Sequence, residues 1–327
     1  MFNLFSKYFI LMNLILLSII SLFMNDFMNI WFLMEINNFL FISYMAMYMN
    51  NKKMIFFYFL IQIIPSMILI FSISLNLMNM FDKKMITYLI YLSLMVKLGI
   101  PPFHFWMPLL SLYLFWDMLF FLLTIQKIIP FYMFSLINMK NFQILLILFM
   151  CSVIPPLMML NLLNLKKLLT YSSINQSGWL MLLIYFKNIL WLTYLMLYTF
   201  IMMIMFFMLS FYKIFYNFLN INNFNLNLFT IIMILNMASM PPFSFFILKW
   251  FSIFIMMNNS FNLFMMMILM IFSSFFMFFL YINMLYLNMF INISKSKLYS
   301  YQPNYLKISH MFLYFFIIIL SPIIMII

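Results

Sequence analysis

The chain has 327 residues, of which 69% are hydrophobic and 6% are charged, and its mean hydropathy is +1.17. A soluble domain has about 45–50% apolar and about 25% charged residues, so this composition excludes a soluble globular protein. A helix that spans a bilayer needs about 20 mainly apolar residues, and such stretches recur along the chain. We therefore predict an all-α polytopic membrane protein.

The few charged and reactive residues narrow the function further. All 16 basic residues are lysines, only Asp26, Glu35, Asp82 and Asp117 oppose them, and the net charge is +12. The lysines are scattered between apolar runs, which indicates loop orientation in a membrane and argues against nucleic-acid binding. With one cysteine (Cys151), two histidines and two glycines, the sequence offers no disulfide framework, zinc site, iron–sulfur ligands or phosphate-binding glycine loop. We expect no metal, no cofactor and no redox centre in this chain.

About eleven membrane helices are predicted from the charge-free apolar stretches, and the first is expected to be retained because no cleavage site follows it. The residues from 250 to 294 are too many for one crossing, so we place a turn at 258–260. The predicted helices cover approximately residues 8–24, 27–49, 54–75, 85–102, 111–130, 141–160, 168–186, 188–211, 226–253, 260–287 and 308–326.

The loop lysines predict an orientation. With eleven crossings, nine lysines fall on the side of the N-terminus and four on the opposite side. The side with more lysines is the inner one, so the N-terminus is expected on the matrix or cytoplasmic side of its membrane. The nine are Lys7, Lys52, Lys53, Lys166, Lys167, Lys213, Lys295, Lys297 and Lys307, and the four are Lys83, Lys84, Lys140 and Lys187.

Four ionisable residues fall inside predicted helices, namely Glu35, Lys97, Lys127 and Lys249. A charge at the bilayer centre costs at least about 2.5–3.5 kcal/mol, so such groups indicate function. Burial disfavours the charged form of a lysine and a nearby carboxylate restores it. We hypothesise that Glu35 and Lys97 form an ion pair whose making and breaking switches the affinity of the other lysines for protons. The alternatives are lysines that reach the interface from misplaced helix ends and a Glu35 that is only a static partner.

A weak internal repeat breaks two of the predicted helices. Gly99, Pro101 and Pro102 lie in the first Pro-Pro-Phe element, and Pro241 and Pro242 lie in a second one 140 residues later. Two consecutive prolines interrupt a helix, and broken helices at matching positions of two halves are typical of transporters, although two such pairs can also arise by chance. His104 follows the first break. It either relays protons or has a purely structural role among the neighbouring aromatic residues.

Around these residues the sequence resembles a known family. The block KLGIPPFHFWMP at 97–108 resembles the signature of subunit 2 of mitochondrial NADH:ubiquinone oxidoreductase, respiratory complex I. Together with the residue composition, which is typical of an AT-rich organellar gene, the resemblance indicates an insect or another invertebrate. Similar blocks stand, in the family's order, at residues 31–37, 124–130, 168–179 and 240–250.

The resemblance implies a single antiporter-like membrane domain over residues 1–327. Its inverted repeats would cover about 8–130 and 141–287, each with a discontinuous helix, and be followed by the C-terminal helix at 308–326. Glu35 and Lys97 match the family's coupling pair, Lys127 its central lysine and Lys249 the lysine of the second half.

The resemblance also implies proton translocation in the mitochondrial inner membrane by an H⁺-translocating NADH:ubiquinone reductase, in which this chain has no catalytic activity alone. FMN, iron–sulfur clusters and ubiquinone would be bound by other subunits. The expected partners are other membrane-arm subunits, further antiporter-like subunits among them, accessory subunits, and lipids such as cardiolipin. An independent cation/proton antiporter and a structural scaffold that does not pump remain alternatives.

The sequence departs from the family's pattern at several positions. Gln176 stands where the family often has histidine, and Leu109 stands where it has an acidic residue, so titratable groups are missing from possible proton routes. Ala238 and Ser239 replace the usual glycines of the second break, so a stiffer geometry is expected there. Asp117 is unusual for its place.

Overall fold

The computed structural model describes residues 2–78, 82–137, 141–160, 162, 164–186, 189–211, 232–241, 243–259 and 264–296. Nearly all of them are helical, and no strand occurs in these ranges. Six helical segments in this part of the chain are long and apolar enough to cross a membrane: 27–48, 52–78, 116–136, 142–159, 190–207 and 264–284. The predicted all-α membrane fold is therefore confirmed. The predicted C-terminal helix at 308–326 and Pro242 lie outside the described residues.

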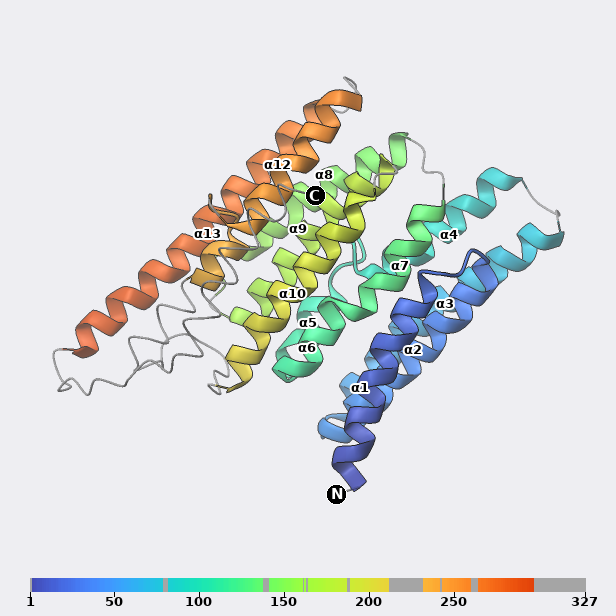
Figure 1. The fold of residues 1–327 in the computed structure, drawn as a ribbon, viewed down its shortest axis with the longest axis horizontal. Helices are drawn as coiled ribbons and strands as arrows, with labels where there is room; N and C mark the ends of the chain where they lie inside the picture. Colours follow the sequence, from blue (N-terminus) through green and yellow to red (C-terminus); the bar gives the residue numbers. More distant parts are fainter. Residues whose placement is uncertain are drawn as a thin grey trace. The chain divides into compact units, whose positions relative to one another are not determined.

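The chain forms two compact units, Met1–Ile147 and Leu148–Ile327. In the first unit α3 packs against α2 and α4, and α7 contacts α1, α2, α4 and α6 (Figure 1). The predicted single domain and its repeat boundaries stay predictions. The helices of the first unit are α1 (Phe2–Ser21), α2 (Phe27–Tyr48), α3 (Lys52–Met78), α4 (Lys83–Leu98), α5 (Trp106–Tyr113), α6 (Trp116–Leu123) and α7 (Ile125–Leu136).

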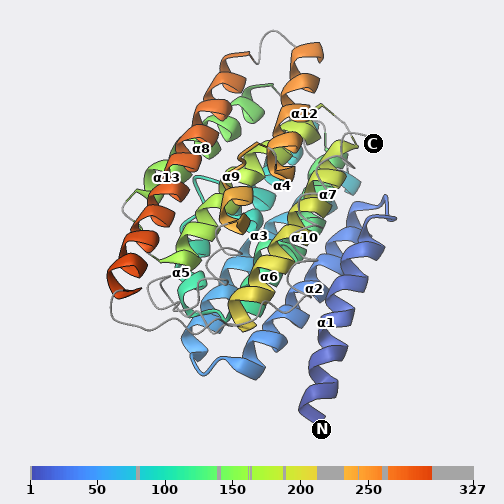
Figure 2. The same cartoon turned by 60° about the vertical axis from the view of Figure 1, so that its left-hand side comes forward.

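The second unit is built around one buried helix. The boundary between the units falls within α8 (Asn141–Met159), and α9 (Leu165–Tyr185), α10 (Leu190–Phe211), α12 (Ser244–Asn259) and α13 (Phe264–Ser296) follow. Figure 2 shows these helices from a second direction. Because α10, α12 and α13 all contact α9, nearly every side chain of α9 is buried, including its serines, Asn175 and Gln176. Residues 232–237 are also helical.

The first predicted helix break is present. Helix α4 ends at Leu98, and Gly99 adopts the left-handed conformation with φ 61°. The N–H of Gly99 donates to the carbonyl of Val96 at 3.1 Å and that of Ile100 to Met95 at 3.1 Å, which is the Schellman arrangement that closes a helix. The two prolines that follow supply no N–H donors, so the chain does not become helical again until Trp106.

The second break repeats this turn 140 residues later. Ser239 adopts φ 57°, its N–H donates to Asn236 at 2.9 Å, and the N–H of Met240 donates to Leu235 at 3.2 Å. These two bonds match the two bonds of the first break, because each donor and each acceptor lies 140 residues after its equivalent there. The internal repeat inferred from two Pro-Pro-Phe elements is thus a repeat of backbone geometry.

The prediction of one continuous helix over 111–130 was wrong. The chain leaves the helical conformation at Leu114 and Phe115, where α5 ends and α6 begins, and it is interrupted again at Thr124 between α6 and α7. The Thr124 hydroxyl donates to the carbonyl of Phe120 at 2.6 Å, and the ring of Pro130 removes one helical donor a turn and a half later. Hydropathy does not register these interruptions, because every segment involved is apolar.

Candidate functional site

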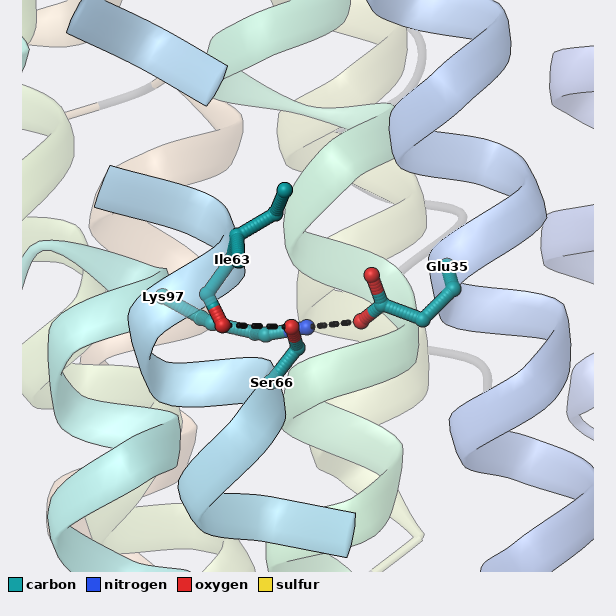
Figure 3. A network of polar contacts seen from close by, with 4 residues as sticks. All are labelled: Glu35, Ile63, Ser66 and Lys97. Carbon is teal, nitrogen blue, oxygen red and sulfur yellow. Dashed lines mark hydrogen bonds and ion pairs between the residues drawn. The ribbon is translucent and has the colours of Figure 1, made fainter. Parts of the chain in front are cut away.

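Glu35 and Lys97 form an ion pair inside the first unit. The Lys97 Nζ donates to Oε1 of Glu35 at 2.6 Å, and the two side chains are 1% and 13% exposed, respectively. Figure 3 shows Glu35 reaching from α2 and Lys97 from α4 toward one another, with Ser66 of α3 drawn beside the pair. Lys97 stands in the last turn of α4, directly before the Gly99 turn, so the helix break fixes where its side chain begins.

Glu35 differs from the other three carboxylates of the chain in its low solvent exposure. Asp26, Asp82 and Asp117 are all exposed, as expected for groups at helix ends. Removing a charge from water is costly and is offset only when a partner lies at hydrogen-bonding distance, which Lys97 provides for Glu35. The ion pair that the sequence suggested is thus present, while its role in proton transfer stays a prediction.

Lys127 shares a cavity with Lys97. Lys127 is 4% exposed and lies in the first turn of α7, directly after the interruption at Thr124. We call the cavity that Lys97 and Lys127 share the lysine cavity. The volume in which the centre of a water molecule fits is about 10 Å³, which is on the order of the volume that one water needs. Its polar lining consists of Asn38, Tyr58, Gln62, Lys97, Gln126 and Lys127.

The amides of this cavity were missed in the sequence. Asn38 and Gln62 are each 5% exposed, and the Asn38 Nδ2 has no hydrogen-bond partner among the described residues. A buried amide without a protein partner in a cavity of this size is a suitable binding point for a water molecule. The signal was available, because Asn37-Asn38, Gln62 and Gln126 interrupt apolar spans, but hydropathy does not reveal that they face the lysines.

His104 is placed apart from this group. It is 2% exposed, its ring centroid lies 4.2 Å from that of Phe105, and it is not among the residues that line the lysine cavity. The structure therefore brings Glu35, Lys97 and Lys127 together in the first unit and leaves His104 in the segment between α4 and α5. A role for His104 as a proton relay stays a prediction.

Lys249 is a buried lysine of the second unit, as is Lys166 in the first turn of α9. Lys249 lies on α12 and is 5% exposed, its Nζ donates to Oγ of Ser239 at 2.7 Å, and it lies 5.7 Å from the ring centroid of Trp179. An ammonium over an indole ring is a favourable cation–π arrangement. The second break is joined to α12 through Asn236, whose Oδ1 accepts from the Ser244 hydroxyl at 3.2 Å and from the N–H of Phe245 at 3.5 Å.

Two departures from the family pattern have distinct surroundings. Gln176 is buried in α9 and accepts a hydrogen bond from the hydroxyl of Tyr194, itself fully buried in α10. A neutral hydrogen-bonding group thus occupies this place. Leu109 is 49% exposed on α5, outside the lysine cavity. Asp117 is exposed in the first turn of α6, where a carboxylate is favourable beside the free N–H groups of the helix N-terminus.

Metal chemistry finds no support in the described part of the chain, where no group of three or more His, Cys, Asp or Glu side chains could hold an ion. The arrangement instead suits the storage and transfer of protons between lysines, a carboxylate and water.

Comparison with known proteins identifies relatives of this chain. No family model matches the chain. It is 30% identical over 261 residues to NADH-ubiquinone oxidoreductase chain 2 of Anopheles gambiae, a match that covers 73% of this chain and 74% of that protein. It is 33% identical over 263 residues to the protein of the same name from Rhipicephalus sanguineus, which covers 76% of this chain and 79% of that protein.

The chain belongs to the NADH-ubiquinone oxidoreductase chain 2 family. The family resemblance found in the sequence is confirmed, and the invertebrate origin expected from it fits the arthropod relatives. A solved structure, respiratory complex I from Thermus thermophilus with bound aureothin, contains a similar chain with a TM-score of 0.76 and 17% identity. The match covers 86% of this chain and 70% of that one and shows that the fold is shared. In this member of the chain 2 family, the antiporter-like fold holds both helix breaks and the buried Lys97, Lys127 and Lys249.

Proposed function

We propose that this chain is a core membrane-arm subunit of proton-translocating NADH:ubiquinone oxidoreductase in the mitochondrial inner membrane. In this proposal it moves protons through buried lysine and glutamate side chains while electrons pass from NADH to ubiquinone elsewhere in the complex. The observation that carries the proposal is the ion pair of the part-buried Glu35 with the buried Lys97, which lines a cavity together with a second buried lysine, Lys127.

The pair acts as a switch. While Glu35 lies 2.6 Å from Lys97, its negative charge favours the ammonium form of the lysine. When the pair opens, Lys97 keeps its burial but loses this compensation, so its proton is released more readily. A water in the lysine cavity between Lys97 and Lys127 gives this proton an acceptor, and the amide groups of Asn38 and Gln62 orient that water.

Lys127 receives the charge that Lys97 releases. Two ammonium groups that face one small cavity repel each other strongly where water is scarce, so charging one disfavours charging the other. The charge is therefore expected to alternate between Lys97 and Lys127, under the control of Glu35. In the second unit, Lys249 is the corresponding proton-carrying group of this proposal.

The remaining parts of the complex supply the redox chemistry in this proposal. FMN, iron–sulfur clusters and ubiquinone are bound by other subunits, and further antiporter-like subunits, accessory subunits and lipids such as cardiolipin are the neighbours. In this proposal the N-terminus lies in the matrix, which the excess of predicted loop lysines on the N-terminal side supports.

Membership of the complex is tested on a native gel of solubilised inner membrane. The gel is stained for NADH oxidation and probed for this chain, and we expect the chain to migrate with the NADH-oxidising band. Migration away from that band contradicts the proposal and favours an independent cation/proton antiporter.

Proton transfer is tested in the purified complex, reconstituted into liposomes, with Lys127→Met. We expect fewer protons translocated per NADH oxidised than in the native complex, because the charge released by Lys97 has lost its acceptor. The matched control is Lys84→Met, which removes an exposed lysine at the start of α4 and is expected to leave the ratio unchanged. A native ratio in Lys127→Met favours a scaffold that does not pump.

A further inference from the structure

The two helix breaks begin with the same hydrogen-bonded turn but have different residues at the position that needs a left-handed conformation. Gly99 holds φ 61° in the first break and Ser239 holds φ 57° in the second. Glycine adopts this conformation freely, whereas a residue with a side chain adopts it at a cost. Gly99 shows what the turn alone requires, so a serine at the matching position calls for a separate reason.

The surroundings of Lys249 supply that reason. The sequence contains no Asp or Glu after Asp117, so the second unit has no acidic side chain to pair with this lysine. Lys97 of the first unit pairs with Glu35, but Lys249 donates to the Ser239 hydroxyl at 2.7 Å and faces the ring of Trp179. Ser239 thus supplies the hydrogen-bond acceptor that a carboxylate supplies in the first unit.

The direction of the hydrogen bonds fits this role. The Ser239 Oγ donates its own proton to the carbonyl of Ala238 at 2.7 Å, so its lone pairs are left to accept from Lys249. An ammonium has only donors, and this arrangement therefore orients the side chain of Lys249 toward the interrupted backbone. Glycine at position 239 would allow the same turn without offering this acceptor.

We propose that Ser239 is a positioning residue for proton translocation, whose hydroxyl holds the Lys249 ammonium against the second helix break. The inference rests on the proposed function, because it assumes that Lys249 carries protons.

Three substitutions at this position separate the hydroxyl from the backbone. Ser239→Gly relaxes the turn and removes the acceptor, Ser239→Ala keeps the strain and removes the acceptor, and Ser239→Asn suits the left-handed turn and keeps an acceptor oxygen. A structural role predicts that glycine and asparagine behave alike and alanine stands apart. A positioning role predicts that glycine and alanine behave alike and asparagine restores function.

The experiment measures protons translocated per NADH oxidised by the reconstituted complex for the three variants, with Lys249→Met as the reference for losing the lysine. We expect Lys249→Met to lower the ratio, Ser239→Gly and Ser239→Ala to show most of the same loss, and Ser239→Asn to return it to near the native value. A structure of the Ser239→Gly complex is expected to show the Lys249 ammonium displaced from the turn, which gives a readout besides activity.

The outcomes distinguish the two claims. A native ratio in Lys249→Met removes the lysine from the proton path and overturns both the second-unit part of the proposed function and the role of Ser239. A lowered ratio in Lys249→Met together with a native ratio in Ser239→Gly overturns only the role of Ser239. A native ratio in Ser239→Gly and Ser239→Asn with a low ratio in Ser239→Ala also overturns the role of Ser239, because the ratio then depends on the backbone conformation and not on the acceptor.

Discussion

Lys97 donates a hydrogen bond to Glu35 at 2.6 Å although the two residues are separated by 62 positions and lie on different helices. Replacing one member leaves the other charge buried without its partner, which costs about 3–5 kcal/mol in buried pairs. Lys97→Met and Glu35→Leu are therefore each expected to lower the thermal stability of the assembled complex. The double variant is expected to be more stable than either single variant, because a buried apolar pair leaves no unpaired charge. If the two losses simply add in the double variant, the pair is not coupled.

Gly99→Ala tests the turn of the first break. A side chain at φ 61° costs about 1–2 kcal/mol, and the new Cβ would lie 2.9 Å from the terminal carbon of Met107. Since that methionine end is flexible, the backbone term is expected to dominate. Gly99→Asn, which tolerates this conformation better, is expected to destabilise less in thermal unfolding of the purified complex. Equal losses in the two variants would show that contact with Met107, and not the backbone, decides the cost.

Gln176→Leu tests the neutral group that stands where the family often has histidine. The hydroxyl of Tyr194 is buried and donates to this glutamine, so the substitution leaves a buried donor unsatisfied at a cost of about 1–3 kcal/mol. Adding Tyr194→Phe removes the donor as well and is expected to recover most of the stability. The comparison is made by thermal unfolding, and a double variant no better than Gln176→Leu alone would contradict a direct bond.

Asn38→Leu tests the water of the lysine cavity. The substitution fills space beside Lys97 and Lys127 and removes the unpartnered amide, so proton transfer between the lysines is expected to slow. The matched control is Ser43→Leu, at an exposed position of the same helix. Protons translocated per NADH should fall in the first variant and stay native in the second. An unaffected ratio in Asn38→Leu would mean that this cavity does not conduct.

The fold was largely predictable from the sequence because apolar length and charge placement act locally. The apolar runs predicted α2, α3, α8 and α10 to within a few residues, and the two Pro-Pro-Phe elements predicted both helix breaks. The interruptions at Leu114 and Thr124 could not be predicted in this way, because neither position carries a glycine or a proline.

The site was predictable only where charge made it conspicuous. Glu35 and Lys97 stood out as rare charges in apolar spans, and the structure pairs them. The contact of Lys249 with Ser239 could not be foreseen, since it depends on how the second break turns the backbone. Asn38 and Gln62 are ordinary polar residues until folding places them beside two lysines.

In the proposed function, opening and closing of the Glu35–Lys97 pair drives proton transfer. It is tested most directly by the ratio of protons translocated to NADH oxidised in the reconstituted complex carrying Glu35→Gln, which keeps the shape of the side chain and removes its charge. Asp26→Asn makes the same chemical change at an exposed acid of the α2 N-terminus and serves as the control. We expect a lowered ratio in Glu35→Gln and a native ratio in Asp26→Asn. A native ratio in Glu35→Gln would contradict this role of the pair.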